Sequence, residues 1–87
     1  MQEWTFLSNY ALVLLAIARD PERRMRDIAD EVRITERAAH RIVNELAAGG
    51  YLSKHRVGRR NSYELHPEVH LHHPLERNYS VGDLLEL

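Results

Sequence analysis

Residues 28–43 read IADEVRITERAAHRIV, and this stretch predicts two short helices folded about a tight turn. We expect the first helix at residues 27–32, packing through its isoleucine, alanine and valine. Thr35 is a credible N-cap for the second helix, which should run to about Ala48. The glycine pair that follows offers a left-handed C-cap, so the second helix should end there.

The turn carries Arg33 at a position where such turns usually have glycine. A residue with a Cβ costs roughly 1 kcal/mol more than glycine in the left-handed region, which a single turn can tolerate. The second helix divides into an apolar face and a polar, mostly cationic face. The apolar stripe is Ala38, Ala39, Ile42, Val43 and Leu46, and the polar stripe is Arg37, His40, Arg41 and Asn44.

Upstream, residues 8–19 read SNYALVLLAIAR and predict a helix that Ser8 caps and Pro21 terminates. The helix is apolar almost all round and therefore requires broad cover. Residues 24–26 are expected to form a very short strand with Met25 pointing inward. The apolar residues of the first helix that share one face are Ala11, Leu14, Leu15 and Ala18.

Downstream, residues 52–57 and 62–65 have strand character, and the GRRN between them carries turn residues. These residues predict a β-hairpin with a short basic tip. Residues 66–80 are polar and contain two prolines, so we expect them to cross the surface as a connection. Ser80 then caps a short C-terminal helix with Val81, Leu84 and Leu85 on one side.

Charge is unevenly distributed along this 87-residue chain, although its net charge is only −1. From Arg33 to Tyr63, seven basic residues oppose two acidic ones, a net +5, whereas the remainder carries five basic and eleven acidic residues, a net −6. A local positive field attracts polyanions even when the total charge is near zero. A chain of this length suits one domain, which is only marginally stable alone, so oligomerisation would help it.

Several protein classes are excluded by composition. The chain has no cysteine, hence no disulfide framework, thiolate zinc site or thiol nucleophile, which fits a cytosolic protein. No apolar run approaches the roughly 20 residues that span a bilayer, and the start lacks the basic segment of a secretory signal. Nucleophile-elbow and phosphate-loop patterns are absent. We therefore expect a cytoplasmic protein that is no enzyme, has no cofactor and has no membrane partner.

The order helix, short strand, helix, turn, helix and two-stranded wing resembles a winged helix-turn-helix domain, most closely the short regulators related to the MarR family. The segments RDIADEVRITERAAHRIVNELAAGGYL and RVGRRNSYEL carry the resemblance, which covers about residues 8–66. It implies a mainly α fold with a three-helix core, a two- or three-stranded sheet whose hairpin forms a wing, and a short C-terminal helix. We expect one domain over residues 1–87, with 67–87 as a connection, a short helix and a candidate dimer contact.

The resemblance further implies a sequence-specific transcriptional regulator that binds double-stranded DNA, with residues 35–48 as the recognition helix in the major groove. Arginine grips guanine O6 and N7 in a bidentate manner, and asparagine pairs with adenine N6 and N7. The free N–H groups at the helix start can hold a phosphate. The candidate DNA-binding residues on this helix are Thr35, Glu36, Arg37, His40, Arg41 and Asn44.

Residues 57–62 are expected to place the wing on the DNA backbone or in the minor groove, where a narrow A·T-rich groove attracts a guanidinium. Lys54 and Arg56 alternate on one strand face and would meet phosphates. Together with the turn residue of the helix pair, this candidate set is Arg33, Lys54, Arg56, Arg59, Arg60 and Asn61.

Apolar residues at the two ends of the chain either cap a small core or build a dimer interface. MarR-like regulators pair through terminal helices, and a homodimer would set two recognition helices one DNA turn apart. The tail is shorter than the dimerising helices of the family, so the family's ligand pocket, and with it any effector, stays unassigned. The candidate interface residues are Trp4, Phe6, Leu7, Leu84, Leu85 and Leu87.

Two other functions remain open alternatives. The winged helix is either a DNA reader or a protein–protein interaction module, whose acidic remainder would serve a basic partner. The stretch HPEVHLHH, residues 66–73, holds four histidines, and imidazole suits zinc, copper or nickel. A metal-responsive regulator that uses the cluster from His66 to His73, chiefly His70, His72 and His73, is the weaker alternative, because this spacing matches no common structural zinc pattern.

Overall fold

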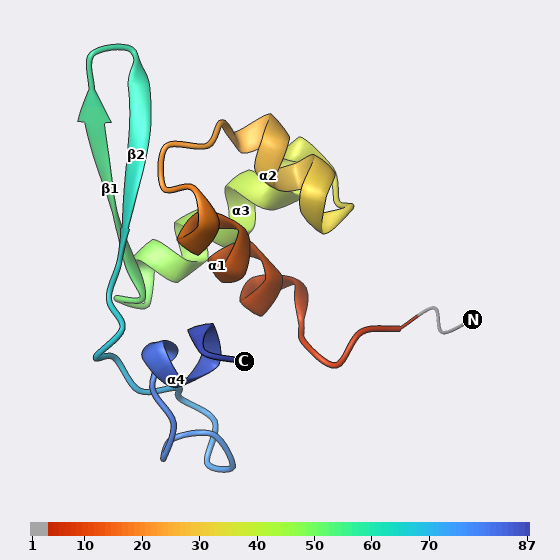
Figure 1. Ribbon diagram of the computed structural model, residues 1–87, viewed down its shortest axis with the longest axis vertical. Coiled ribbons are helices and arrows are strands. Elements are labelled where there is room, and N and C mark those ends of the chain that lie inside the picture. The colour runs from red at the N-terminus through yellow and green to blue at the C-terminus, as the bar shows by residue number, and fades with distance from the viewer. Residues whose placement is uncertain (1–3) are drawn as a thin grey trace.

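A computed structural model describes residues 4–87 of the chain (Figure 1). The helices α1, α2 and α3 pack on one another, β1 lies against α3, and β2 lies against α1. This arrangement confirms the predicted winged helix-turn-helix fold, with a two-stranded antiparallel sheet as its wing. The elements in chain order are α1 (Asn9–Arg19), α2 (Met25–Val32), α3 (Glu36–Ala48), β1 (Leu52–Val57), β2 (Arg60–Leu65) and α4 (Val81–Leu85).

Helix α1 begins and ends where the sequence predicts. The Ser8 hydroxyl accepts from the Ala11 N–H at 3.4 Å, and the helix stops at Asp20, directly before Pro21. The predicted apolar face is wrong in part, because Ala18 is exposed and only Leu14 of that set is fully buried. Since α1 packs on α2, α3, β2 and α4, its position among them, rather than its own periodicity, selects the buried side. The buried residues are Val13, Leu14, Ala16 and Ile17.

The short strand expected at residues 24–26 is wrong, because α2 already begins at Met25. Arg24 is the N-cap, and its carbonyl accepts from the N–H groups of Asp27 and Ile28 at 3.0 and 3.1 Å. Its side chain makes no capping hydrogen bond. The helix start therefore lacks the Ser, Thr, Asp or Asn that would have announced it in the sequence.

The turn between α2 and α3 has the predicted left-handed residue. Arg33 has φ 69° and ψ 45°, and the next N–H, of Ile34, donates to the Ala29 carbonyl at 3.0 Å. The Thr35 hydroxyl then accepts from the Ala38 N–H at 3.0 Å, which confirms it as the N-cap of α3. Arginine thus occupies a position that favours glycine, and Thr35 still caps α3 two residues later.

The glycine pair ends α3 as predicted. Gly50 has φ +84°, and its N–H donates to the Ala47 carbonyl at 3.1 Å. The Tyr51 N–H donates to the Leu46 carbonyl at 3.0 Å, which completes a Schellman motif. The chain therefore leaves α3 in a fixed direction and enters β1 two residues after the pair.

The wing is tighter than the sequence suggested. β1 and β2 pair from Leu52 opposite Leu65 to Val57 opposite Arg60, so Gly58 and Arg59 alone form the connection. Gly58 has φ +63°, as the first position of a type II′ hairpin turn requires. The expected four-residue turn is wrong by two positions, because the last two residues of GRRN already belong to β2.

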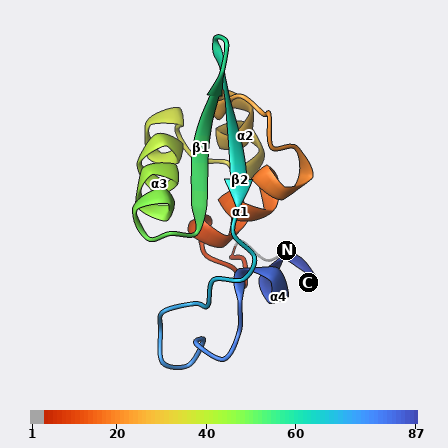
Figure 2. The same cartoon turned by 90° about the vertical axis from the view of Figure 1, so that its left-hand side faces the viewer.

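One apolar cluster unites the three helices, the base of the wing and α4. Val81 of α4 is completely buried in it, and the Ser80 and Asp83 side chains form a capping box that fixes the start of this helix. Residues 66–87 lie at one end of the molecule, opposite the tip of the wing (Figures 1 and 2). None of the helices in residues 4–87 is long and apolar enough to cross a membrane.

Candidate nucleic-acid interface

Helix α3 presents its polar stripe to solvent and its apolar stripe to the core. Ala39, Ile42, Val43 and Leu46 are buried, whereas Ala38 is only partly covered. All six candidate residues of this helix and its cap are exposed: Thr35, Glu36, Arg37, His40, Arg41 and Asn44. A helix with a solvent-facing row of donors beside a solvent-facing wing has the shape that enters a major groove.

The Arg41 side chain on α3 is held by neighbours that the sequence did not single out. The Arg41 guanidinium donates to Glu45 Oε1 at 3.2 Å, one turn further along the helix. Glu45 Oε2 accepts from the Tyr10 hydroxyl of α1 at 2.8 Å. Tyr10, Glu45 and Arg41 therefore form a chain of contacts from the core-facing helix to the exposed stripe. In the sequence, only the i, i+4 spacing of Arg41 and Glu45 indicates any part of this chain of contacts.

The wing contacts α3 through Lys54. Its ammonium group donates to the Asn44 Oδ1 atom at 2.6 Å, so the amide oxygen of Asn44 is occupied. Lys54 is predicted to meet phosphates, and in the free protein its side chain bridges the wing and α3. The free face of the Asn44 amide is therefore its NH₂ group, a donor.

The other basic side chains of the wing are exposed. Arg56 lies opposite Asn61 in the ladder, and Val57 lies opposite Arg60, so the basic residues gather at the outer half of the hairpin. Within residues 4–87, no carboxylate lies within 4.0 Å of the guanidinium groups of Arg56, Arg59 or Arg60. His55 differs, because its ring contacts Glu64 across the ladder at 3.0 Å.

The wing tip and the N-terminal end of α3 lie at the same end of the molecule (Figure 2). Arg33 is exposed in the turn just before α3. Figure 1 shows that the turn and the start of α3 lie on the far side of the helices from the wing, so these elements face the same end of the molecule but stand apart across it.

The candidate dimer residues fall into two groups. Phe6 and Leu87 are 87% and 84% exposed, and Trp4 packs edge-on against Phe6 with ring centroids 4.7 Å apart. Leu7, Leu84 and Leu85 are partly buried, and the last two pack on the core. Trp4, Phe6 and Leu87 thus present exposed apolar surface, whereas Leu7, Leu84 and Leu85 mainly cap the domain.

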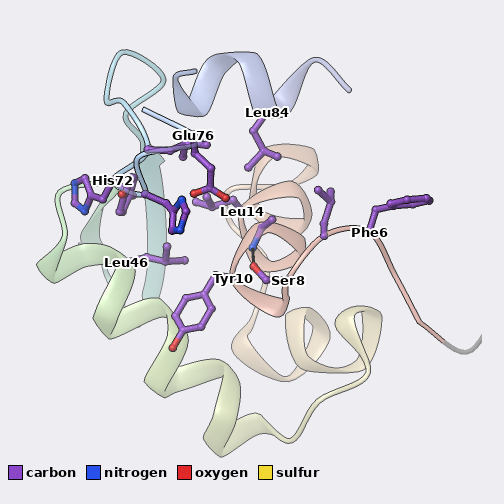
Figure 3. A pocket seen from close by; sticks show the side chains of 13 residues that line it. Phe6, Ser8, Tyr10, Leu14, Leu46, His72, Glu76 and Leu84 are labelled. Atoms are coloured by element: carbon purple, nitrogen blue, oxygen red, sulfur yellow. Dashed lines mark hydrogen bonds between the residues drawn. The ribbon is translucent and has the colours of Figure 1, made fainter. Parts of the chain in front are cut away.

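A cavity of about 450 Å³ lies between the N-terminal segment, α1, α3 and the connection of residues 66–80 (Figure 3). Its wall includes Phe6, Tyr10, Tyr51, His72 and Glu76. Burial raises the pKa of the Tyr51 hydroxyl, and the nearby carboxylate of Glu76 adds to this effect.

The histidines of residues 66–73 point to different partners. The His70 ring contacts the Arg77 carbonyl at 2.7 Å, and the His73 ring accepts from the Leu75 N–H at 3.1 Å. The His72 ring packs on Tyr51, with centroids 5.0 Å apart. Nowhere in residues 4–87 do three or more side chains of the metal-binding types come together. The arrangement therefore gives no support to the metal-responsive alternative.

Comparison with known proteins agrees with this geometry. A model of the MarR family matches residues 5–60. Among solved structures, the PcaV transcriptional regulator from Streptomyces coelicolor, crystallised with its natural ligand, is similar at 30% sequence identity and a TM-score of 0.59. The match covers 77% of this chain and 49% of the PcaV chain, so the chain spans about half the length of that relative. No curated protein shows significant similarity.

Proposed function

Because the chain belongs to the MarR family, we propose that it is a transcriptional regulator that recognises a specific sequence of double-stranded DNA. The exposed cationic stripe of α3 beside a basic wing is the observation that carries this proposal. We also propose that it acts in the cytoplasm. Residues 1–87 would work as one domain, since α4 completes the core beneath α1.

In this proposal, α3 lies in the major groove and reads bases through its exposed stripe. Arg37 and His40 make no side-chain hydrogen bond within residues 4–87 and are free to meet guanine. Arg41, oriented by Glu45, is the second arginine reader. Asn44, whose oxygen is occupied by Lys54, would donate from its amide to a base acceptor.

In the same proposal, the start of α3 and the turn before it hold the DNA backbone. Thr35 and the first N–H groups of α3 would bind a phosphate, and Arg33 would add a positive charge beside them. Glu36 either accepts from cytosine N4 or complements the helix dipole. These contacts set the register of the helix and carry little sequence information.

The wing lies along the minor groove in the same proposal. Arg59 sits in the two-residue turn, at the point of the hairpin that reaches furthest from the helices, and is the candidate for insertion. Arg56, Arg60 and Asn61 follow on the strands and would meet sugars and phosphates. Lys54 lies nearer to α3 and would add positive charge where the major-groove helix and the wing join.

We further propose a homodimer that uses the exposed apolar residues Trp4, Phe6 and Leu87. A two-fold dimer would set two copies of α3 one DNA turn apart, as palindromic half-sites require. Sedimentation of the free protein and of its complex with one duplex tests this stoichiometry. A complex that contains a single copy on a duplex with two half-sites would contradict it.

Selection of bound duplexes from a random pool, followed by fluorescence anisotropy on the selected sequence, tests the whole proposal. We expect a defined half-site and an affinity whose logarithm falls with the logarithm of salt by about 0.9 per phosphate neutralised. Failure to enrich any sequence, together with no binding to duplex DNA at low salt, would refute it. Retained activity after neutralising Arg59 and Arg60 would instead favour a protein-interaction module.

A further inference from the structure

A hollow of about 180 Å³ lies on the β2 side of the wing, away from α3. Its walls come from two segments that are more than 30 residues apart, the link between α1 and α2 and the outer half of the hairpin. Four arginines line it, two from each segment. The lining residues that bear charge are Arg23, Arg24, Arg59, Arg60 and Glu22.

The two walls of the hollow are fixed to each other. The Tyr63 N–H of β2 donates to the Pro21 carbonyl at 3.0 Å, which fastens the α1–α2 link to the wing. Arg23 is only 25% exposed and is held by an ion pair with Glu31 of α2. The Arg23 guanidinium is therefore already in place for a ligand, and its ordering on binding would cost little entropy.

The charges of the hollow do not cancel. Glu31 compensates Arg23, and Asp27 lies 3.7 Å from the Arg24 guanidinium. Within residues 4–87 no carboxylate lies within 4.0 Å of Arg59 or Arg60, and Glu22 is the one acidic residue among the lining residues. The uncapped start of α2 adds a partial positive charge on the same side. The hollow thus favours an anion with planar or tetrahedral oxygens, the geometry that arginine matches best.

The position of the hollow indicates which anion it meets. In Figure 2 the hairpin lies between α3 on one side and the α1–α2 link on the other. The minor groove is bordered by the sugar-phosphate backbones of the two DNA strands, so a wing in the groove has one backbone on each side. In this arrangement α3 and the turn before it contact the backbone on their own side. We propose that the hollow binds a backbone phosphodiester of the second strand through Arg24, a residue outside the candidate DNA-binding set. This inference rests on the DNA-binding function proposed above.

The test compares three variants on the selected duplex. Arg24→Gln should reduce the slope of log affinity against log salt by about 1 and weaken binding equally for all sequences. Arg24→Lys should restore the slope, because it keeps the charge. Arg77→Gln is the matched control, since it removes an exposed arginine at the opposite end of the molecule and should leave the slope unchanged. Thermal unfolding of each free variant separates a folding defect from a lost contact.

Phosphate ethylation interference then identifies the strand. With the wild-type protein, ethylation of one phosphate across the minor groove from the α3 contacts should block binding, and Arg24→Gln should be insensitive to that modification. An unchanged slope and an unchanged interference pattern for Arg24→Gln would overturn the inference, while loss of binding in Arg37→Ala would still uphold the proposed function. Saturable binding of inorganic phosphate at micromolar concentration, seen in the amide NMR signals of Arg24 and Arg60, would make the hollow a free-anion site and also overturn it.

Discussion

Tyr10 of α1 and Glu45 of α3 are joined by a hydrogen bond of 2.8 Å between the phenol and the carboxylate, across 35 residues of sequence. The second oxygen of Glu45 accepts from Arg41, which faces the proposed DNA surface. Tyr10 also lines the cavity of about 450 Å³ between the ends of the chain. A residue outside the proposed DNA surface therefore helps to fix the direction of a side chain on that surface.

Tyr10→Phe should lower the base preference at the position that Arg41 reads, because Glu45 loses one of its two partners. An exposed hydrogen bond of this kind contributes about 1 kcal/mol or less to folding, so the melting temperature should change little. Random-pool selection measures the preference. Tyr79→Phe is the control, as an exposed tyrosine without such a bond. In an Arg41→Ala background Tyr10→Phe should have no further effect, and an additive effect would contradict the linkage.

Arg41→Ala and Arg59→Ala should produce different losses. Removal of a bidentate base reader costs about 1–3 kcal/mol and relaxes specificity at one base pair. Removal of the wing arginine should weaken binding to A·T-flanked and G·C-flanked sites unequally, since a narrow minor groove attracts the guanidinium most strongly. Anisotropy titrations on duplexes that differ only in the half-site or only in its flanks separate the two. If both variants lose affinity for the same set of duplexes, the placement of α3 in the major groove and of the wing in the minor groove is contradicted.

Lys54→Met should change both the strength and the selectivity of binding. It removes a positive charge, which should reduce the salt slope if Lys54 also lies near a phosphate, and it frees the oxygen of Asn44. The freed amide can then accept as well as donate, so the base preference at its position should shift toward adenine. Selection with Lys54→Met and with Arg56→Met compares the two strand positions. The same preference in both variants would show that the bond to Asn44 does not act in the complex.

Arg33→Gly should stabilise the fold and weaken DNA binding. The left-handed conformation costs an arginine about 1 kcal/mol relative to glycine, and part of this gain is offset by the greater freedom of glycine in the unfolded chain. Urea denaturation measures the stability, and anisotropy measures the binding. Arg37→Gly is the opposite case, because glycine inside α3 should destabilise by about 1 kcal/mol. A stabilised Arg33→Gly with undiminished affinity would remove Arg33 from the proposed interface.

Val81→Ala should destabilise the protein by about 2 kcal/mol, because a completely buried side chain at the junction of α4 with α1 would leave a cavity. A single cooperative transition with a lower midpoint in urea is the expected result. Leu75→Ala, at an exposed position of the same segment outside the proposed dimer interface, is the control. A wild-type midpoint for Val81→Ala would show that residues 66–87 do not share the unfolding transition of the helices.

Local capping chemistry explains which parts of the fold were predictable. Thr35 and Ser80 each have a hydroxyl at the right position, so both helix starts were found in the sequence. Helix α2 has Arg24 as its cap, without a capping side chain, and its first turn was mistaken for a strand. The buried side of α1 was not predictable either, since its residues are apolar all round and only the packing of its neighbours distinguishes them.

The candidate interface was predictable as a surface and not as a set of contacts. The spacing of Arg37 and Arg41 and the basic tip of the hairpin identify the exposed rows correctly. The bonds of Lys54 to Asn44 and of Tyr10 to Glu45 depend on how the wing and α1 pack against α3. Such contacts between distant segments have no periodic signature in the chain.

The opposite placement of charge along the molecule has a kinetic consequence. The basic wing lies at one end, and residues 66–87, with four acidic residues and one basic residue, lie at the other (Figure 1). The molecule is thus an electric dipole along an axis of 39 Å, and the field of a polyanion exerts a torque that turns the wing forward before contact. Because the Debye length is about 8 Å at physiological salt, this rotation occurs only in the last stage of approach. It shortens the orientational search and raises the association rate, whereas the lifetime of the complex depends on the contacts that form afterwards.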